Sequence, residues 1–206
     1  MENPILLSTA YLPPIEYIIQ CMNHKTITIE LLETFPKQTY RNRCHIATAN
    51  GLLALTIPVK KPNGNHTPTQ DILLETNNRW NIIHWRAIHS AYSHSPYFLY
   101  YSDAFEGIYR NPPKTLVEFN EALLKVIFKL LKVEVEIKYT NDFVSITNST
   151  TDLRNLIHPK QTFDYQSKPV DFKMYTQTFN NKYPFIPNLS IIDLLFNEGS
   201  SSLDYL

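Results

Sequence analysis

Apolar and polar residues repeat with two different periods along the chain. Residues 5–12 are apolar and strand-forming, residues 15–22 place apolar side chains three and four positions apart, and residues 25–32 alternate. These patterns predict a strand, an amphipathic helix and a second strand. Pro13 and Pro14 end the first strand and suit the first turn of the helix. The opening is therefore predicted to form a βαβ unit.

A β-hairpin is predicted around Asn50-Gly51, which lies between two strand-forming runs. The Asn-Gly pair suits a two-residue turn, because both residues tolerate a positive φ. Residues 60–70 are expected to form a polar loop, and residues 71–75 a further strand.

Helical periodicity follows the hairpin region. Residues 80–94, 98–109 and 116–130 carry helical patterns, and Thr115 and Glu118 have the spacing of a capping box. Residues 133–139 alternate as a strand does. A last short helix is expected between Ser190 as N-cap and Gly199. Residues 150–186 have no clear period, which indicates a covering segment or lid.

These segments predict one α/β or α+β domain over residues 1–206. It would comprise an N-terminal strand–helix–strand unit, a hairpin and a helical middle. The order of the strands is left open by the sequence.

Composition excludes several classes of function. Nineteen Lys and Arg balance nineteen Asp and Glu, which disfavours a nucleic-acid partner. No apolar run is long enough to span a bilayer, and Cys21 and Cys44 fit a reducing compartment, so a cytoplasmic protein is expected. The chain contains no P-loop, GxGxxG, GxSxG or HExxH motif.

A cationic segment precedes the hairpin. If residues 37–46 are extended, one face carries Lys37, Thr39, Arg41, Arg43 and His45. Two arginines at this spacing match a phosphate or carboxylate, with His45 as a proton-transfer group. The alternative is a solvated edge strand whose charges deter aggregation.

Other polar residues lie on faces predicted to be buried. His84 lies on the apolar face of its helix, where a core histidine is more common than a catalyst. His89 and His94 approach a ligand spacing, but no carboxylate cluster joins them, so no metal is expected. Asn120 either bridges elements or faces a pocket, and Asp193 complements a helix dipole.

Ordered blocks along nearly the whole chain resemble the WbqC-like family of bacteria. They are "YLPPIEYI", "YRNRCHI" with "LTIPV", the helix with Trp80, His84 and Tyr92, the helix with Asn120, "HPK" and "NLSIIDLLFNEG". The opening "STAYLPPIEY" departs from the family pattern: Ser8, Pro14 and Glu16 replace the expected Gln, Trp and Gly. If the first loop is the active site, this departure puts activity in doubt.

The resemblance implies a role in O-antigen, lipopolysaccharide or other surface-polysaccharide synthesis. With the cationic segment, it suggests group transfer on a nucleotide-activated sugar. The alternative is a non-catalytic binding or assembly protein, so enzymatic activity stays open. The expected partner is an anionic small molecule without a cofactor, and a homo-oligomer is left open. The candidate catalytic residues are His84 and His45, and the candidate binding residues are Tyr11, Tyr17, Lys37, Arg41, Asn42, Arg43, Tyr92, Asn120, Ser190 and Asp193.

A weaker analogy concerns the fold alone. The opening strand, Pro/aromatic loop, helix and strand are also similar to nucleotidylyltransferase-type α/β domains, which bind phosphates at the first loop. The histidine motif of those domains is absent here.

Overall fold

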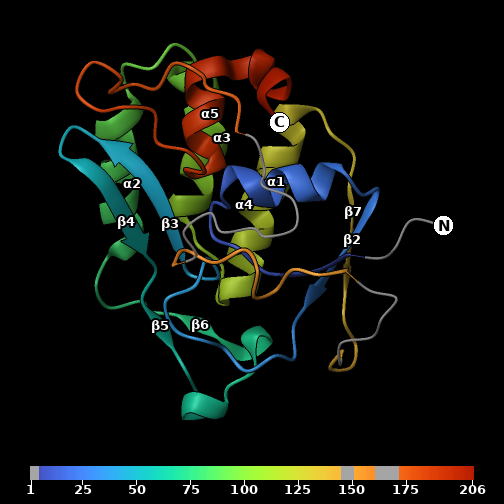
Figure 1. Ribbon diagram of the computed structural model, residues 1–206. Helices are drawn as coiled ribbons and strands as arrows, with labels where there is room; N and C mark the ends of the chain where they lie inside the picture. The colour runs from blue at the N-terminus through green and yellow to red at the C-terminus, as the bar shows by residue number, and fades with distance from the viewer. Residues whose placement is uncertain (1–4, 145–150, 161–171) are drawn as a thin grey trace.

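A four-stranded parallel sheet organises the fold (Figure 1). The structure is a computed structural model that describes residues 5–144, 151–160 and 172–206. The sheet has the order β7-β2-β1-β8, with every neighbouring pair parallel. Its strands are β1 (Ile5–Ser8), β2 (Thr26–Glu30), β7 (Glu136–Tyr139) and β8 (Thr151–Asp152). Helix α1 (Ile15–Met22) joins β1 to β2, which confirms the predicted βαβ unit.

The predicted hairpin is present, with its turn displaced by one residue. Strand β3 (Arg43–Thr48) pairs with β4 (Gly51–Thr56), and Thr48 lies opposite Gly51. The turn residues are therefore Ala49 and Asn50, whereas Gly51 adopts the positive φ of 96°. A second antiparallel pair joins β5 (Val59–Lys60) to β6 (Leu73–Leu74). Two 3₁₀ turns, η1 (Gly64–His66) and η2 (Thr69–Asp71), lie between them.

The predicted helices are present as α2 (Trp80–Tyr92), α3 (Phe98–Arg110), α4 (Leu116–Leu131) and α5 (Ile191–Glu198). The capping box at the start of α4 is complete: Thr115 accepts the Glu118 amide, and the Glu118 side chain accepts the Thr115 amide. Ser190 precedes α5, but its hydroxyl donates to the Leu12 carbonyl instead of capping the helix. A 3₁₀ segment, η3 (Gly199–Tyr205), follows α5.

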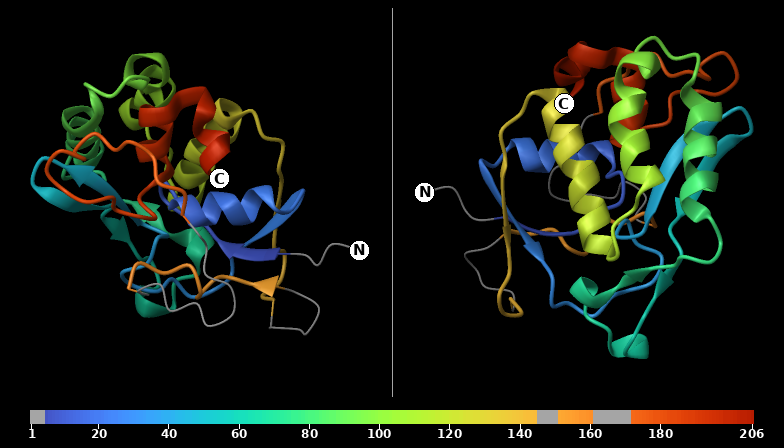
Figure 2. Two further views of the ribbon diagram at one scale, coloured as in Figure 1. Left: turned by 45° about the horizontal axis from the view of Figure 1, so that its top comes forward. Right: turned by 180° about the vertical axis from the view of Figure 1, so that it is seen from behind.

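The α-helices are grouped on one side of the fold. In Figure 1 the β3–β4 hairpin lies beside α2 on the left and the β2 and β7 strands lie on the right. Seen from behind, α2, α3 and α4 run side by side (Figure 2). One hydrophobic core includes residues of β1, β2, β3 and all five α-helices. The described elements therefore form a mixed α/β fold around a single core, as the sequence predicted.

Strand β8 was not predicted from the sequence. It lies within residues 150–186, which were expected to be a covering segment or lid, and pairs with β1 through Thr151 and Asp152. Part of that segment, residues 161–171, lies outside the described residues.

Candidate functional site

Polar side chains gather where the parallel strands end. Ser8 ends β1, Glu30 ends β2, Thr140 follows β7, and Arg154 lies two residues after β8. Because these strands are parallel, their carboxyl ends meet at one edge of the sheet. The Thr140 hydroxyl donates to Glu30 (2.9 Å), the Ser8 hydroxyl donates to the Arg154 carbonyl (3.3 Å), and Arg154 pairs with Glu30 (3.2 Å). All four strands thus contribute to one polar cluster.

This edge contains the topological switch point of the sheet. From β1 the chain proceeds to β2 and β7 on one side, and β8 then lies on the other side of β1. In open α/β sheets, ligands bind outside the carboxyl ends of the strands at such a point. A small pocket lies there, between the ends of β1 and β8. Its lining residues are Leu7, Ser8, Thr9, Ala10, Tyr17, Tyr40, Arg41, Leu153, Arg154 and Ile157.

The pocket is almost filled by its own side chains. Its free space of about 10 Å³ is on the scale of one water molecule. Tyr17 is fixed in the wall, since its hydroxyl donates to the Ser8 carbonyl (2.9 Å). A larger ligand therefore requires lining side chains to move.

Arg154 is held by two carboxylates. Its guanidinium donates to Asp152 through Nε and Nη2, with a shortest contact of 2.7 Å, and to Glu30 through Nη1. Burial opposes ionisation of Asp152, but the Arg154 side-chain and backbone hydrogen bonds outweigh it and lower the pKa of Asp152. The same side-chain hydrogen bond raises the pKa of Arg154. Arg154 is therefore a fixed, permanent positive charge.

Arg41 is the second buried cation at this edge. Its Nε and Nη2 donate in parallel to the two carboxylate oxygens of Glu33, at 2.7 Å each, and its side chain is 3 % exposed. Nη2 also approaches the Arg154 carbonyl at 3.5 Å. This fork geometry matches a phosphate equally well. A phosphate would have to replace Glu33, because Glu33 already occupies the fork.

Asn120 ties the Arg41 segment to the sheet. From α4, its amide donates to the Thr9 hydroxyl (3.0 Å) and to the Arg41 carbonyl (2.8 Å). Its buried Oδ1 has no hydrogen-bond partner among the described residues. Asn42 beside it donates to the Ile57 carbonyl (2.8 Å). Both amides are thus bridges that position Arg41.

His158 is a titratable residue close to this edge. Its Nδ1 accepts the backbone N–H of Lys160 at 3.1 Å, so the neutral ring carries its proton on Nε2. Burial, followed by the positive charges of Arg41 and Lys160, lowers the pKa of His158. The ring is therefore a neutral hydrogen-bond donor at pH 7.

The cationic face expected over residues 37–46 is not formed as one strand. Residues 37–42 form turns and bends, and β3 begins only at Arg43. Lys37 is exposed and Arg41 points inward, whereas the Arg43 Nε donates to the Thr56 hydroxyl (3.0 Å). The turn after Lys37 separates Arg41 from the regular alternation of β3. The alternation of side chains along a strand therefore does not predict which way Arg41 faces.

His45 and His84 are not among the residues that line the pocket. His45 packs edge-on against Tyr40, and burial, then Arg43, lowers its pKa. The Nδ1 atom of His84 lies 2.9 Å from the Tyr11 hydroxyl, which lies 2.6 Å from that of Tyr109. Burial lowers the pKa of His84 to about 4, despite a hydrogen bond with the Thr56 backbone that raises it. His84 is thus a neutral core residue within a tyrosine network.

The remaining candidates gather around α5. Asp193 accepts hydrogen bonds from the hydroxyls of Tyr92 (2.8 Å) and Tyr175 (2.7 Å). Ser190 donates to Leu12, as described above. None of Tyr92, Ser190 and Asp193 lines the switch-point pocket. Of the residues nominated from the sequence, the structure places Tyr17 and Arg41 in the pocket lining. Asn120 bonds to the Arg41 carbonyl, and Asn42 follows Arg41 in the chain and bonds to Ile57.

Five residues of this edge were not identified from the sequence: Glu30, Glu33, Asp152, Arg154 and His158. For Glu30 and Glu33 the available signal was their position at and just after the end of an alternating run, since polar residues at the ends of parallel strands converge. Strand β8 has only two residues, so no period marked Asp152 and Arg154 as such a site.

Other site types are not found in the described part of the chain. It contains no group of three or more His, Cys, Asp or Glu side chains placed to hold a metal ion. Within the same residues, no helix is long and apolar enough to cross a membrane.

Comparison with known proteins identifies one family. The sequence model of the WbqC-like protein family matches residues 9–205. The chain is also 29% identical over 196 residues to Rv1507c of Mycobacterium tuberculosis, described as an uncharacterized protein, covering 84% of this chain and 83% of that one. No solved structure matches the chain with statistical significance, so the likeness to nucleotidylyltransferase domains is not confirmed.

Proposed function

The chain belongs to the WbqC-like protein family, and we propose that it acts in the synthesis of O-antigen, lipopolysaccharide or another surface polysaccharide. The proposed activity is group transfer on a nucleotide-activated sugar bound at the carboxyl edge between β1 and β8. The observation that carries this proposal is the pair of buried arginines, Arg41 and Arg154, at the switch point of the sheet.

Arg41 would bind the diphosphate by exchanging its partner. Its guanidinium holds the two oxygens of Glu33 in a fork, and a phosphate offers the same two acceptors with more negative charge. Glu33 lies in the segment after β2 and its side chain is 12 % exposed, so its carboxylate can turn toward solvent.

Other groups at the edge would bind the sugar. The Thr9 hydroxyl and the Nε2–H of His158 are hydrogen-bond donors on or beside the lining, and the Ser8 hydroxyl, which donates to the Arg154 carbonyl, can accept a further hydrogen bond. Asp152 and Glu30 hold Arg154 in place. The two arginines face three carboxylates, Glu30, Glu33 and Asp152, so these side chains together carry a net negative charge. The ligand would therefore bind well only when Glu33 leaves Arg41.

The exchange predicts opposite effects for the two partners of the ion pair. Thermal-shift and calorimetric titrations with UDP-, GDP- and dTDP-sugars should identify one that stabilises the wild type. Arg41→Ala should abolish that binding, whereas Glu33→Gln should tighten it by about tenfold, because the competing carboxylate is removed. Arg43→Ala is the matched control, since Arg43 bonds to Thr56 outside the pocket lining.

Two results would contradict this proposal. The first is that none of these sugar nucleotides stabilises the wild-type protein. The second is that Glu33→Gln weakens binding as much as Arg41→Ala does, which would make the ion pair structural.

A second candidate function is a non-catalytic binding or assembly protein of the same pathway. It is favoured because Arg41, Arg43 and His84 each bond to a different partner, Glu33, Thr56 and Tyr11, and do not converge on one pocket. Mass spectrometry of the stabilising sugar nucleotide after incubation with candidate acceptors distinguishes the two. Binding without a new product supports the second candidate, and a transferred group supports the enzyme.

A further inference from the structure

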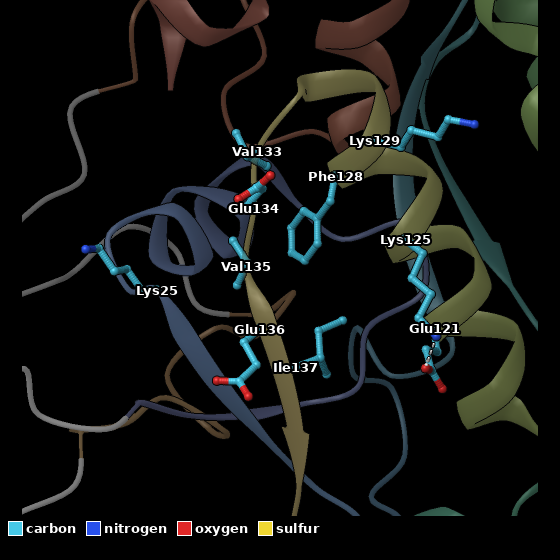
Figure 3. A pocket seen from close by; sticks show the side chains of 10 residues that line it. All are labelled: Lys25, Glu121, Lys125, Phe128, Lys129, Val133, Glu134, Val135, Glu136 and Ile137. Carbon is cyan, nitrogen blue, oxygen red and sulfur yellow. Dashed lines mark ion pairs between the residues drawn. The ribbon is translucent and has the colours of Figure 1, made fainter.

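A large open groove lies on the opposite side of the sheet from β8. It runs between α4 and β7 and holds about 880 Å³. Figure 3 shows Phe128 and Lys125 on the helical wall and Ile137 on the strand wall. Val133, Val135 and Ile137 are half-buried, whereas Glu134, Glu136 and Lys138 are exposed. Strand β7 (Glu136–Tyr139) and the three residues before it thus present a half-covered apolar row toward α4 and a charged row on the other face.

Strand β7 is also the edge of the sheet in the described residues. The amides of Glu136 and Thr140 donate to Lys25 and Ile29, so the even-numbered residues direct their backbone groups toward β2. In a parallel ladder the alternate residues direct theirs away. Val135, Ile137 and Tyr139 therefore present N–H and C=O groups outward, where a further strand can pair.

We propose that this edge pairs with β7 of a second copy of the chain, antiparallel and about a two-fold axis through Ile137. This register places Ile137 opposite its own counterpart and Val135 opposite the partner's Tyr139. The outward-directed backbone groups of these residues would form the hydrogen-bonded pairs. The two four-stranded sheets would then join into one continuous sheet.

The charges on the strand select this register. With Ile137 on the axis, Glu136 of each copy lies opposite the partner's Lys138, and the pair occurs twice because the interface is symmetric. Within one copy the Glu136 carboxylate already lies 3.3 Å from Lys138 and accepts the Thr26 hydroxyl. Shifting the axis to Glu136 would instead place two glutamates face to face. Self-pairing is therefore electrostatically complementary in this register.

The groove between α4 and β7 would receive the apolar side chains of the partner strand. Residues directly opposite in an antiparallel pair direct their side chains to the same side. The partner's Ile137 and Tyr139 would therefore lie opposite Ile137 and Val135, respectively, and enter the space in front of Phe128. Apolar surface that is half-exposed in one copy would become covered in two.

This inference does not depend on the proposed function. The pockets at the carboxyl ends lie at opposite ends of the joined sheet, because the two copies run antiparallel. Dimerisation would leave both pockets open, so its failure and the failure of sugar-nucleotide binding are separate results.

Charge reversal tests the register directly. Light scattering after size exclusion should give twice the mass of one chain for the wild type at micromolar concentration. Glu136→Lys alone and Lys138→Glu alone each place like charges opposite one another twice, and each should raise the dimer dissociation constant by about tenfold or more. The double variant Glu136→Lys/Lys138→Glu restores the pairs and should dimerise again. An equimolar mixture of the two single variants should form the heterodimer.

Glu106→Lys is the matched control, because Glu106 pairs with Arg110 on α3, away from the groove. Circular dichroism melts establish that each variant is folded. A monomeric wild type would overturn the proposal. So would single variants that dimerise like the wild type, or a double variant and a mixture that both stay monomeric.

Discussion

Asp193 is the carboxylate whose environment opposes its charge most clearly. It is fully buried on α5, and burial raises its pKa from 3.8 to about 6, although the hydroxyls of Tyr175 and Tyr92 donate to it and favour the ionised form. Those hydroxyls link Asp193 to α2 and to the segment before α5. Asp193 therefore anchors α5, and its contribution to the free energy of unfolding depends on pH.

The pH dependence follows from the raised pKa. A group whose pKa is higher in the folded state stabilises the fold fully below its unfolded pKa, and this contribution is lost as pH rises through the folded pKa. The free energy of unfolding of the wild type, relative to Asp193→Asn, should therefore fall by about 2 kcal/mol between pH 4 and pH 7, because part of the full contribution is already lost at pH 4. Urea unfolding at several pH values measures it. Asp103→Asn, at an exposed site on α3, should leave the profile unchanged, and a constant difference for Asp193→Asn would contradict the assignment.

The sequence identified the block that contains Arg41 as unusual, but not which way its side chains face. Arg41, Asn42 and Arg43 stood out as a block, and the structure gives each a separate partner: Glu33, Ile57 and Thr56. The partner of Arg41 lies eight residues away across a turn, and no periodicity connects the two. Long-range ion pairs of this kind depend on the path of the loops, which local patterns do not specify.

The junction between α5 and η3 depends on a glycine. Gly199 has a φ of +56°, and a Cβ at this position would overlap the ring of Tyr97. Gly64 has the same φ of +56° but no atom within 4 Å of an added Cβ. The two positions therefore share a positive φ but differ in steric contact, and the ψ of −122° at Gly199 also lies outside the left-handed helical region.

Substituting both glycines separates the two effects. Gly64→Ala should cost about 1 kcal/mol, the penalty of a left-handed conformation for an L-residue. Gly199→Ala should cost about 2–4 kcal/mol, because the Tyr97 ring must also move. Denaturant unfolding of the two variants measures the difference. Equal costs would mean that Tyr97 rotates away freely.

At the scale of elements, prediction from sequence worked where periodicity was long or the cap was distinctive. Helix α4 has sixteen residues and a complete capping box, and the hairpin carries a Gly with positive φ. Strand β8 has two residues, too few for a period to be seen. Its place in the sheet comes from pairing with β1, and therefore from tertiary structure.

For the whole molecule, the sheet joins segments that are far apart in the chain. Strands β1 and β2 come from the first thirty residues, whereas β7 and β8 lie beyond residue 135. Arg154 after β8 bonds to Glu30 at the end of β2, and Glu30 is fully buried. Glu30 also accepts the amides of Leu32 and Val144. This carboxylate therefore connects the N-terminal βαβ unit to the strands that complete the sheet.

The Glu30–Arg154 pair should consequently be a long-range determinant of stability. Arg154→Met leaves the buried Glu30 charge without its cation and should cost about 3–5 kcal/mol. The double variant Glu30→Gln/Arg154→Met removes both charges of the pair. Its loss of unfolding free energy should therefore be about 1–3 kcal/mol smaller than the sum of the losses in the two single variants.

The exposed Glu121–Lys125 pair on α4 is the matched control. Its double-mutant cycle with Glu121→Gln and Lys125→Met should give a coupling energy of about 0.2–0.5 kcal/mol. Urea unfolding provides all of these values. If the coupling at Glu30–Arg154 is as small as in the control, the backbone pairing of β8 with β1 holds the sheet together without the ion pair.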